Sequence, residues 1–210
     1  LLITKAARGK DEFLKNKSPE KLLYCTRLRY VDSNCKPLGY SPIPSHIEFS
    51  NAIAENIATG CTVVFGSEIK KHFLNADAGN MMMHDWWLYL LAAAFGEIQY
   101  DATPSVLYRQ HGNNVAGWNP RPIKLFHRTL SLRNRLRSGL TGMDSLNQAD
   151  RFIQANLQIS SDKREIVSEL IQLRKTGLLG RFRYLTRARI MRNDFFENLG
   201  LKIIILMGWL

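Results

Sequence analysis

Two short segments of the 210-residue chain concentrate the side chains that could do chemistry. The first is His84-Asp85-Trp86-Trp87, in which an acidic residue opens an apolar run. If that run is a helix, Asp85 lies where backbone N–H groups and the helix dipole stabilise a carboxylate. Asp85 is then either a catalytic base or a simple N-cap. Neighbouring helical residues are ~100° apart, so Trp86 and Trp87 face either a cleft and the core or two packing surfaces.

The second segment is Tyr108-Arg109-Gln110-His111-Gly112-Asn113-Asn114. It places a cation, amides and an imidazole beside a glycine, directly after a predicted strand, and loops at strand ends often carry functional residues. Arg109 could bind a phosphate or the Asp85 carboxylate, and His111 could ligate a metal or bind a diphosphate. A solvated turn with incidental polar groups is the alternative.

The elements expected around both segments are those of an α/β protein. Runs of β-formers and alternating polarity predict strands at residues 22–31, 60–66 (short and buried), 97–100 and 105–109. Helical patterns cover residues 49–57, a segment from about Ser67, and 86–95, which Gly96 ends. Turn chemistry separates them at Asp32-Ser33-Asn34 and Pro37-Leu38-Gly39. We therefore predict a partial, mixed sheet with flanking helices.

The character of the chain changes at about Trp118, which divides it into residues 1–117 and a basic helical region, 118–210. Helices are predicted at 122–137, 144–157 and 162–173. Asp162, with Glu165 three residues later, resembles a capping box. The basic region holds 17 Lys+Arg against 7 Asp+Glu, whereas residues 1–117 are nearly balanced at 12 against 11. This asymmetry points to a polyanionic neighbour, with solvated helix faces as the simpler explanation.

Cysteine spacing and hydropathy indicate the redox compartment and whether the chain could cross a membrane. Cys25, Cys35 and Cys61 have no metal or disulfide spacing, which suits a reducing compartment. Cys25 and Cys61 lie in apolar runs, so we expect both to be small core residues. Residues 1–3 are too short for a secretory signal, and the apolar run 203–210 is well short of the ~20 residues that span a bilayer.

Four motifs occur in an order and spacing that resemble one bacterial enzyme family. Besides the two segments above, they are Val31-Asp32-Ser33-Asn34 with Pro37-Leu38-Gly39, and Thr59-Gly60-Cys61-Thr62. Across about residues 20–118 the chain resembles the family 2, GT-A type glycosyltransferases of bacterial surface-polysaccharide assembly, particularly the rhamnosyltransferase-like branch. The basic helical C-terminal region is also typical of that branch.

The resemblance implies a GT-A fold and an inverting displacement on a nucleotide-sugar, either dTDP-rhamnose or a UDP-sugar. Asp85 matches the family's catalytic base, which takes a proton from an acceptor hydroxyl. The two tryptophans would pack against sugar or support the base, while His111, a candidate metal ligand, would face the diphosphate with Arg109. The implied substrate-binding residues are Thr59, Gly60, Cys61, His84, Trp86, Trp87, Arg109, Gln110, Asn113 and Asn114.

One part of the family pattern is missing from this sequence. Complete members carry a nucleotide-binding half and an Asp-rich motif that holds Mg²⁺ or Mn²⁺, but residues 6–13 contain no Asp-x-Asp. We therefore expect a C-terminal, acceptor-side portion with an incomplete metal site. It would be either a fragment of a longer enzyme or a catalytically inactive remnant that keeps the fold as an interaction surface.

The expected partners follow from the resemblance and the charge. A glycan or lipid-linked acceptor would be met in the cytoplasm, with peripheral contact at the anionic inner face of the cytoplasmic membrane as a further possibility. Val167, Leu170, Ile171 and the run 203–210 could insert there, although helix packing would use them equally well. A nucleic-acid-binding module is disfavoured, because no recognised motif surrounds the basic and aromatic residues at 181–184.

Overall fold

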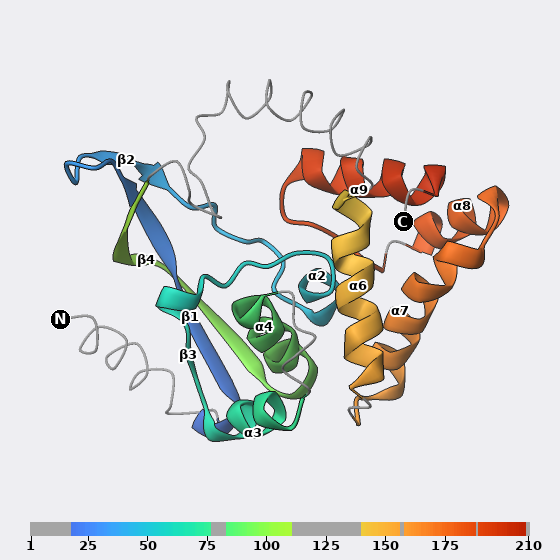
Figure 1. Ribbon diagram of the computed structural model, residues 1–210, viewed down its shortest axis with the longest axis horizontal. Helices are drawn as coiled ribbons and strands as arrows, with labels where there is room; N and C mark the ends of the chain where they lie inside the picture. The colour runs from blue at the N-terminus through green and yellow to red at the C-terminus, as the bar shows by residue number, and fades with distance from the viewer. Residues whose placement is uncertain (1–17, 77–82, 111–139, 156–157, 188, 209–210) are drawn as a thin grey trace.

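The computed structural model describes residues 18–76, 83–110, 140–155, 158–187 and 189–208. Figure 1 shows a sheet on one side of the molecule and a group of C-terminal helices on the other. Helix α4 (His84–Phe95) lies between them. The predicted helix at 122–137 falls outside the described residues.

The sheet has four strands built around β1 (Leu22–Val31). Strand β4 (Glu97–Arg109) runs parallel to β1 along its whole length. The short strands β2 (Pro37–Tyr40) and β3 (Val64–Phe65) pair antiparallel with opposite ends of β1. The predicted mixed α/β sheet with flanking helices is therefore confirmed.

Strand β4 is continuous, which corrects the prediction of two strands separated by Thr103-Pro104. The pairing of Thr26 with Asp101 resumes at Leu28 with Val106, so residues 102–105 bulge out of the ladder. Proline lacks the N–H that a ladder needs, and the bulge removes Pro104 from the pairing. Asp101 stabilises the bulge, because its carboxylate accepts hydrogen bonds from the Thr103 backbone and the Tyr24 hydroxyl.

Short helical elements connect the strands. The single turn η1 (Pro19–Lys21) precedes β1, α3 (Ser67–Asn75) follows β3, and Gly96 ends α4 as expected. The helix predicted at 49–57 is only the turn α2 (Phe49–Ala52), because the chain then leaves it as an irregular segment. Residues 60–66 are not a buried strand: η2 (Gly60–Thr62) turns there and β3 is exposed. Cys61 is likewise exposed, although Cys25 is buried as predicted.

The C-terminal region is helical, as predicted. Its elements are α6 (Leu140–Gln154), α7 (Ser161–Gln172), the turn η4 (Leu173–Lys175), α8 (Leu178–Arg187) and α9 (Phe195–Met207). The Asp162 capping box is wrong, since Ser160 is the N-cap of α7 and makes no side-chain cap. Asp194 caps α9 instead, accepting from the backbone N–H groups of Phe196 and Glu197.

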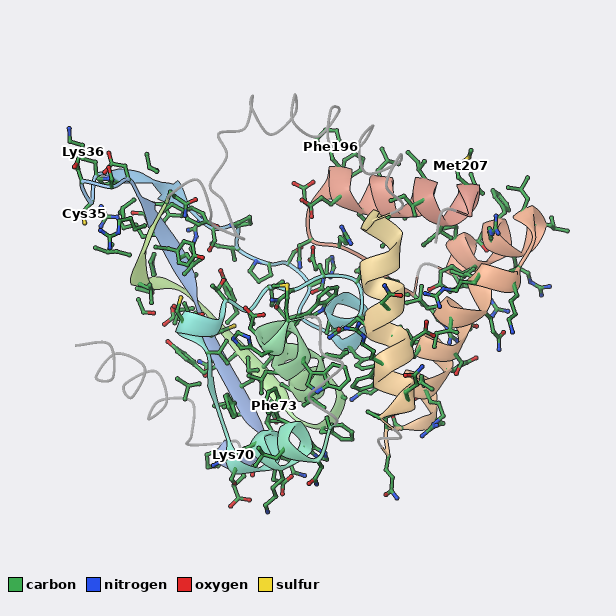
Figure 2. The ribbon with its side chains drawn as sticks, in the orientation of Figure 1. Cys35, Lys36, Lys70, Phe73, Phe196 and Met207 are labelled. Carbon is green, nitrogen blue, oxygen red and sulfur yellow. The ribbon has the colours of Figure 1, made fainter. Side chains whose placement is uncertain are left out.

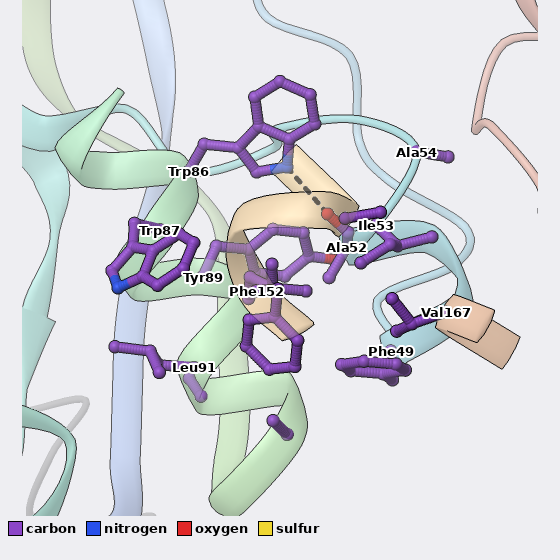
Figure 3. Close-up of a cluster of buried hydrophobic side chains, with 14 of the residues drawn as sticks. Phe49, Ala52, Ile53, Ala54, Trp86, Trp87, Tyr89, Leu91, Phe152 and Val167 are labelled. Carbon is purple, nitrogen blue, oxygen red and sulfur yellow. Dashed lines mark hydrogen bonds between the residues drawn. The ribbon is translucent and has the colours of Figure 1, made fainter. Parts of the chain in front are cut away.

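One hydrophobic cluster joins the sheet, α4 and the C-terminal helices. Figure 3 shows its centre, where Phe152 of α6 packs between Trp87 and Phe49, with ring centroids 5.7 Å from each. Val167 and Leu170 of α7 are also buried in this cluster, so they are core residues and not insertion residues. Within the described part of the chain, no helix is long and apolar enough to cross a membrane.

Candidate active site

Asp85 is the second residue of α4, and its side chain is buried at 8% relative exposure. Met83 occupies the N-cap position in extended conformation and makes no side-chain cap. A carboxylate in the first helical turn is stabilised by the positive end of the helix dipole. The predicted position at the helix start is therefore confirmed.

Three donors hold the Asp85 carboxylate. Its Oδ1 accepts from the Trp86 backbone N–H at 2.8 Å and from Asn56 Nδ2 at 3.1 Å, and its Oδ2 accepts from the Gly60 N–H at 3.0 Å. Two of these donors come from the segment 54–62 and not from α4. An ionised carboxylate has about four acceptor sites, so the described residues leave one, on Oδ2, for another hydroxyl. Such an arrangement fixes the orientation of the carboxylate.

The backbone of Gly60 lies so close to α4 that there is little room for a larger residue at this position. A Cβ on Gly60 would come within 2.9 Å of His84 Nε2 and 3.7 Å of Asp85 Oδ2. Of the predicted acceptor-cleft residues Thr59, Gly60 and Cys61, Gly60 therefore lies against α4, and the role of the three in binding an acceptor stays a prediction. The exposed His84 ring lies on the same side of Gly60.

Both tryptophans are buried in the core, so they support the helix that carries Asp85. Trp86 Nε1 donates to the Ala52 carbonyl at 2.7 Å, the bond drawn in Figure 3. Trp87 packs against Phe152 in the shared core. The two rings therefore anchor α4 to two different packing surfaces, which was one of the two arrangements considered from their spacing.

A cavity of about 350 Å³ lies against the segment that binds Asp85, although Asp85 itself is not one of the residues that line it. Asn56, whose side chain binds Asp85, and Thr59, which precedes Gly60, both line it. The volume is within the roughly 300–1,000 Å³ range of ligand pockets. The full lining comprises Thr26, Tyr30, Ser41, Pro42, Ile43, Pro44, Glu55, Asn56, Ile57, Thr59, Tyr100, Asn193, Asp194 and Glu197.

The charge of that lining is one-sided. Three carboxylates, Glu55, Asp194 and Glu197, contribute to it, and the described lining includes no lysine or arginine. Carboxylates accept hydrogen bonds from hydroxyls but repel phosphates. The cavity therefore suits an uncharged or cationic polyhydroxylated ligand.

Asn193 connects the C-terminal region to the segment that holds Asp85. Its Oδ1 accepts from the backbone N–H groups of Ser45 and His46, both at 2.7 Å, and its own backbone N–H donates to Glu55 Oε1 at 2.8 Å. Its Nδ2 also donates to Glu55. Sequence reasoning missed this contact, since nothing local marks an asparagine that bonds 138 residues away.

Buried Asn51 ties the same segment to α4. Its Nδ2 donates to Glu55 Oε1 at 2.7 Å and to the Met191 carbonyl at 3.1 Å, and its Oδ1 accepts from the Tyr89 hydroxyl at 2.8 Å. The Glu55 carboxylate thus accepts hydrogen bonds from both Asn51 and Asn193. Asn56 is the next residue along the chain. This network holds the Asn56 amide in reach of Asp85.

The second predicted segment is only partly described. Arg109 is the last residue of β4, paired with Val31 and exposed, and it is not one of the three donors to Asp85. Gln110 extends the strand by donating its backbone N–H to Val31. His111, Asn113 and Asn114 lie outside the described residues.

No cluster of three His, Cys, Asp or Glu able to hold a metal ion occurs among the residues that the structure describes. The described part of the chain therefore does not offer the carboxylate seat that a Mg²⁺ or Mn²⁺ ion prefers. The metal site stays a prediction.

Comparison with known proteins gives one match in sequence. The chain is 32% identical over 111 residues to a dTDP-rhamnosyl transferase, RfbG, of Shigella flexneri. The match covers 49% of this chain and 38% of that relative. No protein-family model matches the chain, and no solved structure matches it. The chain is therefore similar to a rhamnosyl transferase over about half its length.

Proposed function

We propose that this chain supplies the acceptor side of a glycosyltransferase of family 2 and GT-A type, with Asp85 as the catalytic base. The observation that carries the proposal is a buried carboxylate oriented by three donors, one of which, Asn56, lines a sugar-sized cavity. The similarity to a dTDP-rhamnosyl transferase supports rhamnose as the transferred sugar and dTDP-rhamnose as the donor.

In the proposed step, an acceptor hydroxyl donates to the free site on Asp85 Oδ2. As its oxygen bonds to the anomeric carbon of the donor, the proton passes to Oδ2. The bond between that carbon and the diphosphate oxygen breaks, and the nucleoside diphosphate leaves with the electron pair. A single displacement of this kind inverts the anomeric centre, and a positioned base contributes about 10²–10⁴-fold to such a step.

The cavity is the proposed seat of the acceptor sugar. Its carboxylates and hydroxyls match the hydroxyl groups of an uncharged glycan, whereas the leaving diphosphate requires cations that its described lining lacks. Tyr30 and Tyr100 add aromatic surface for the apolar faces of a sugar ring. The acceptor would reach Asp85 past Asn56 and Thr59.

Donor consumption tests the function, measured in the longest natural polypeptide that contains these residues. We expect dTDP-rhamnose to be consumed at least about tenfold faster than UDP-glucose. An enzyme discriminates between donors by how strongly it binds their transition states, and the wrong nucleotide-sugar makes fewer of those contacts. Consumption of neither donor would support the alternative, a remnant that keeps the fold as an interaction surface.

Filling the cavity tests where the acceptor binds. Thr59→Phe should abolish transfer to a cell-envelope glycan acceptor while leaving slow hydrolysis of dTDP-rhamnose, because water still reaches Asp85. Thr103→Phe, on the exposed bulge of β4, is the matched control and should transfer normally. Equal transfer by both variants would place the acceptor elsewhere.

A further inference from the structure

The outward face of α9 is apolar although it faces solvent. Phe196, Leu199, Ile203 and Met207 recur at a spacing of three to four residues, and each is between 44% and 56% exposed. Figure 2 shows Phe196 and Met207 projecting from α9 away from the other helices. The opposite face buries Leu201, Ile204 and Ile205 in the core. A soluble helix normally presents polar residues outward, so this face calls for a partner.

Helix α8, which lies next to α9, carries further exposed apolar residues. Leu178, Leu179 and Phe182 are 65%, 84% and 59% exposed. The Arg181 guanidinium lies so close to Gly208 that a side chain there would overlap it, which places the first turns of α8 beside the last turn of α9. We call the seven exposed residues of both helices the α8–α9 face: Leu178, Leu179, Phe182, Phe196, Leu199, Ile203 and Met207.

Basic side chains accompany this face. Arg183 of α8 is exposed and Lys202 of α9 is half-buried beside Ile203, and within the described residues neither has an ion-pair partner. Arg187 and Arg189, by contrast, pair with Glu169 of α7. Residues 118–210 as a whole carry ten more basic than acidic residues. An apolar surface flanked by unpaired cations complements a layer of acyl chains under anionic headgroups.

We propose that the α8–α9 face docks the protein on an anionic lipid surface, with α9 lying in the interface plane. Helix α9 has 13 residues, too few to span a bilayer but enough to lie along its surface. The docking residues differ from Val167 and Leu170, which are buried in the core.

Docking would also fix the position of the candidate site. Asp194, the N-cap of α9, and Glu197, in its first turn, both line the cavity and flank Phe196. A docked α9 therefore brings the cavity to within one helical turn of the headgroups. This consequence rests on the proposed function, and it selects an acceptor sugar carried on a lipid.

Vesicle co-sedimentation tests the docking without any transfer assay. The whole chain should bind vesicles of phosphatidylcholine with 30% phosphatidylglycerol at about 0.1 M salt, and should bind pure phosphatidylcholine much more weakly. Arg183→Gln with Lys202→Gln should lower partitioning roughly 30-fold. Lys70→Gln with Lys71→Gln, exposed cations on α3, is the matched charge control and should change it less than about threefold.

The apolar contribution is tested by Leu199→Ser with Ile203→Ser, which should lower partitioning at least roughly tenfold. Leu74→Ser on α3, 68% exposed, is the control and should have no effect. Circular dichroism confirms that each variant is folded.

Equal binding by the face variants and their controls, or no binding by the wild type, would overturn the proposal. A concentration-dependent dimer in sedimentation velocity, abolished by the same Ser variants, would assign the face to a second copy instead. Vesicle binding without donor consumption would keep the docking and remove the proposed function.

Discussion

Phe152 offers the sharpest test of how the C-terminal helices relate to the sheet. It is 1% exposed, and its ring lies between Trp87 of α4 and Phe49 of α2. Because this core is shared, Phe152→Ala in α6 must also weaken the part of the molecule that holds Asp85. A division into independent units at residue 117 would confine the effect to the helices.

The magnitude follows from the burial. A fully buried Phe→Ala substitution costs about 3–5 kcal/mol, a range that includes the lost aromatic pairs and the cavity left behind. For a chain of this size each kcal/mol shifts Tm by about 2–4 °C, so we expect a loss of roughly 6–20 °C. Phe182→Ala, 59% exposed on α8, should stay within about 0.5 kcal/mol of the wild type.

Thermal unfolding followed by near-UV and far-UV circular dichroism measures both the shift and its cooperativity. We expect one transition for the wild type and one, displaced downward, for Phe152→Ala. Two transitions, of which only one moves, would refute the reasoning. That result would also favour separate domains at 1–117 and 118–210.

Two further perturbations test the network and the core. Asn193→Ala should lower the free energy of unfolding by about 1–2 kcal/mol in urea titrations, because it removes the acceptor of the half-buried His46 N–H and of the exposed Ser45 N–H; a change below about 0.5 kcal/mol would contradict this. Burial raises the pKa of the Cys25 thiol from 9.0 to about 12, so iodoacetamide at pH 8 should alkylate exposed Cys35 first and leave Cys25 intact. Alkylation of native Cys25 as fast as Cys35 would contradict this. Since the pKa of Cys25 is higher in the folded than in the unfolded protein, its contribution to stability is complete below pH 9 and is lost as the pH rises toward 12.

Periodicity predicted the elements that position the candidate base. The alternation in residues 22–31 and the apolar run ending at Gly96 correspond to β1 and α4, because both segments bury what their patterns mark as apolar. The resemblance named both Gly60 and Asp85 as site residues, and the structure shows a hydrogen bond between them that the sequence did not predict.

The errors arose where side-chain hydrogen bonds override local propensity. The β-branched run at 61–65 predicted a strand, but Thr62 bonds the Thr59 carbonyl through both its hydroxyl and its backbone N–H. The turn that results presents Gly60 to Asp85 and turns Cys61 outward. No periodicity argument detects such a turn, because its cause is a polar contact and not an apolar stripe.

The long-range contacts were beyond sequence reasoning for a different reason. Glu55, Asn56 and Asn193 are common surface residue types, and only the folded chain brings them together. The cavity between them likewise combines strand, loop and helix residues from distant parts of the chain.

The central claim is that Asp85 is the base of a sugar transfer, and the transfer rate of Asp85→Asn tests it most directly. The substitution keeps the shape of the side chain but removes its basicity, and Glu68→Gln on α3 is the matched carboxylate-to-amide control. With labelled dTDP-rhamnose and a glycan acceptor, we predict that Asp85→Asn loses about 10²–10⁴-fold in kcat. Glu68→Gln should keep the wild-type rate. Full transfer activity in a folded Asp85→Asn variant would contradict the account.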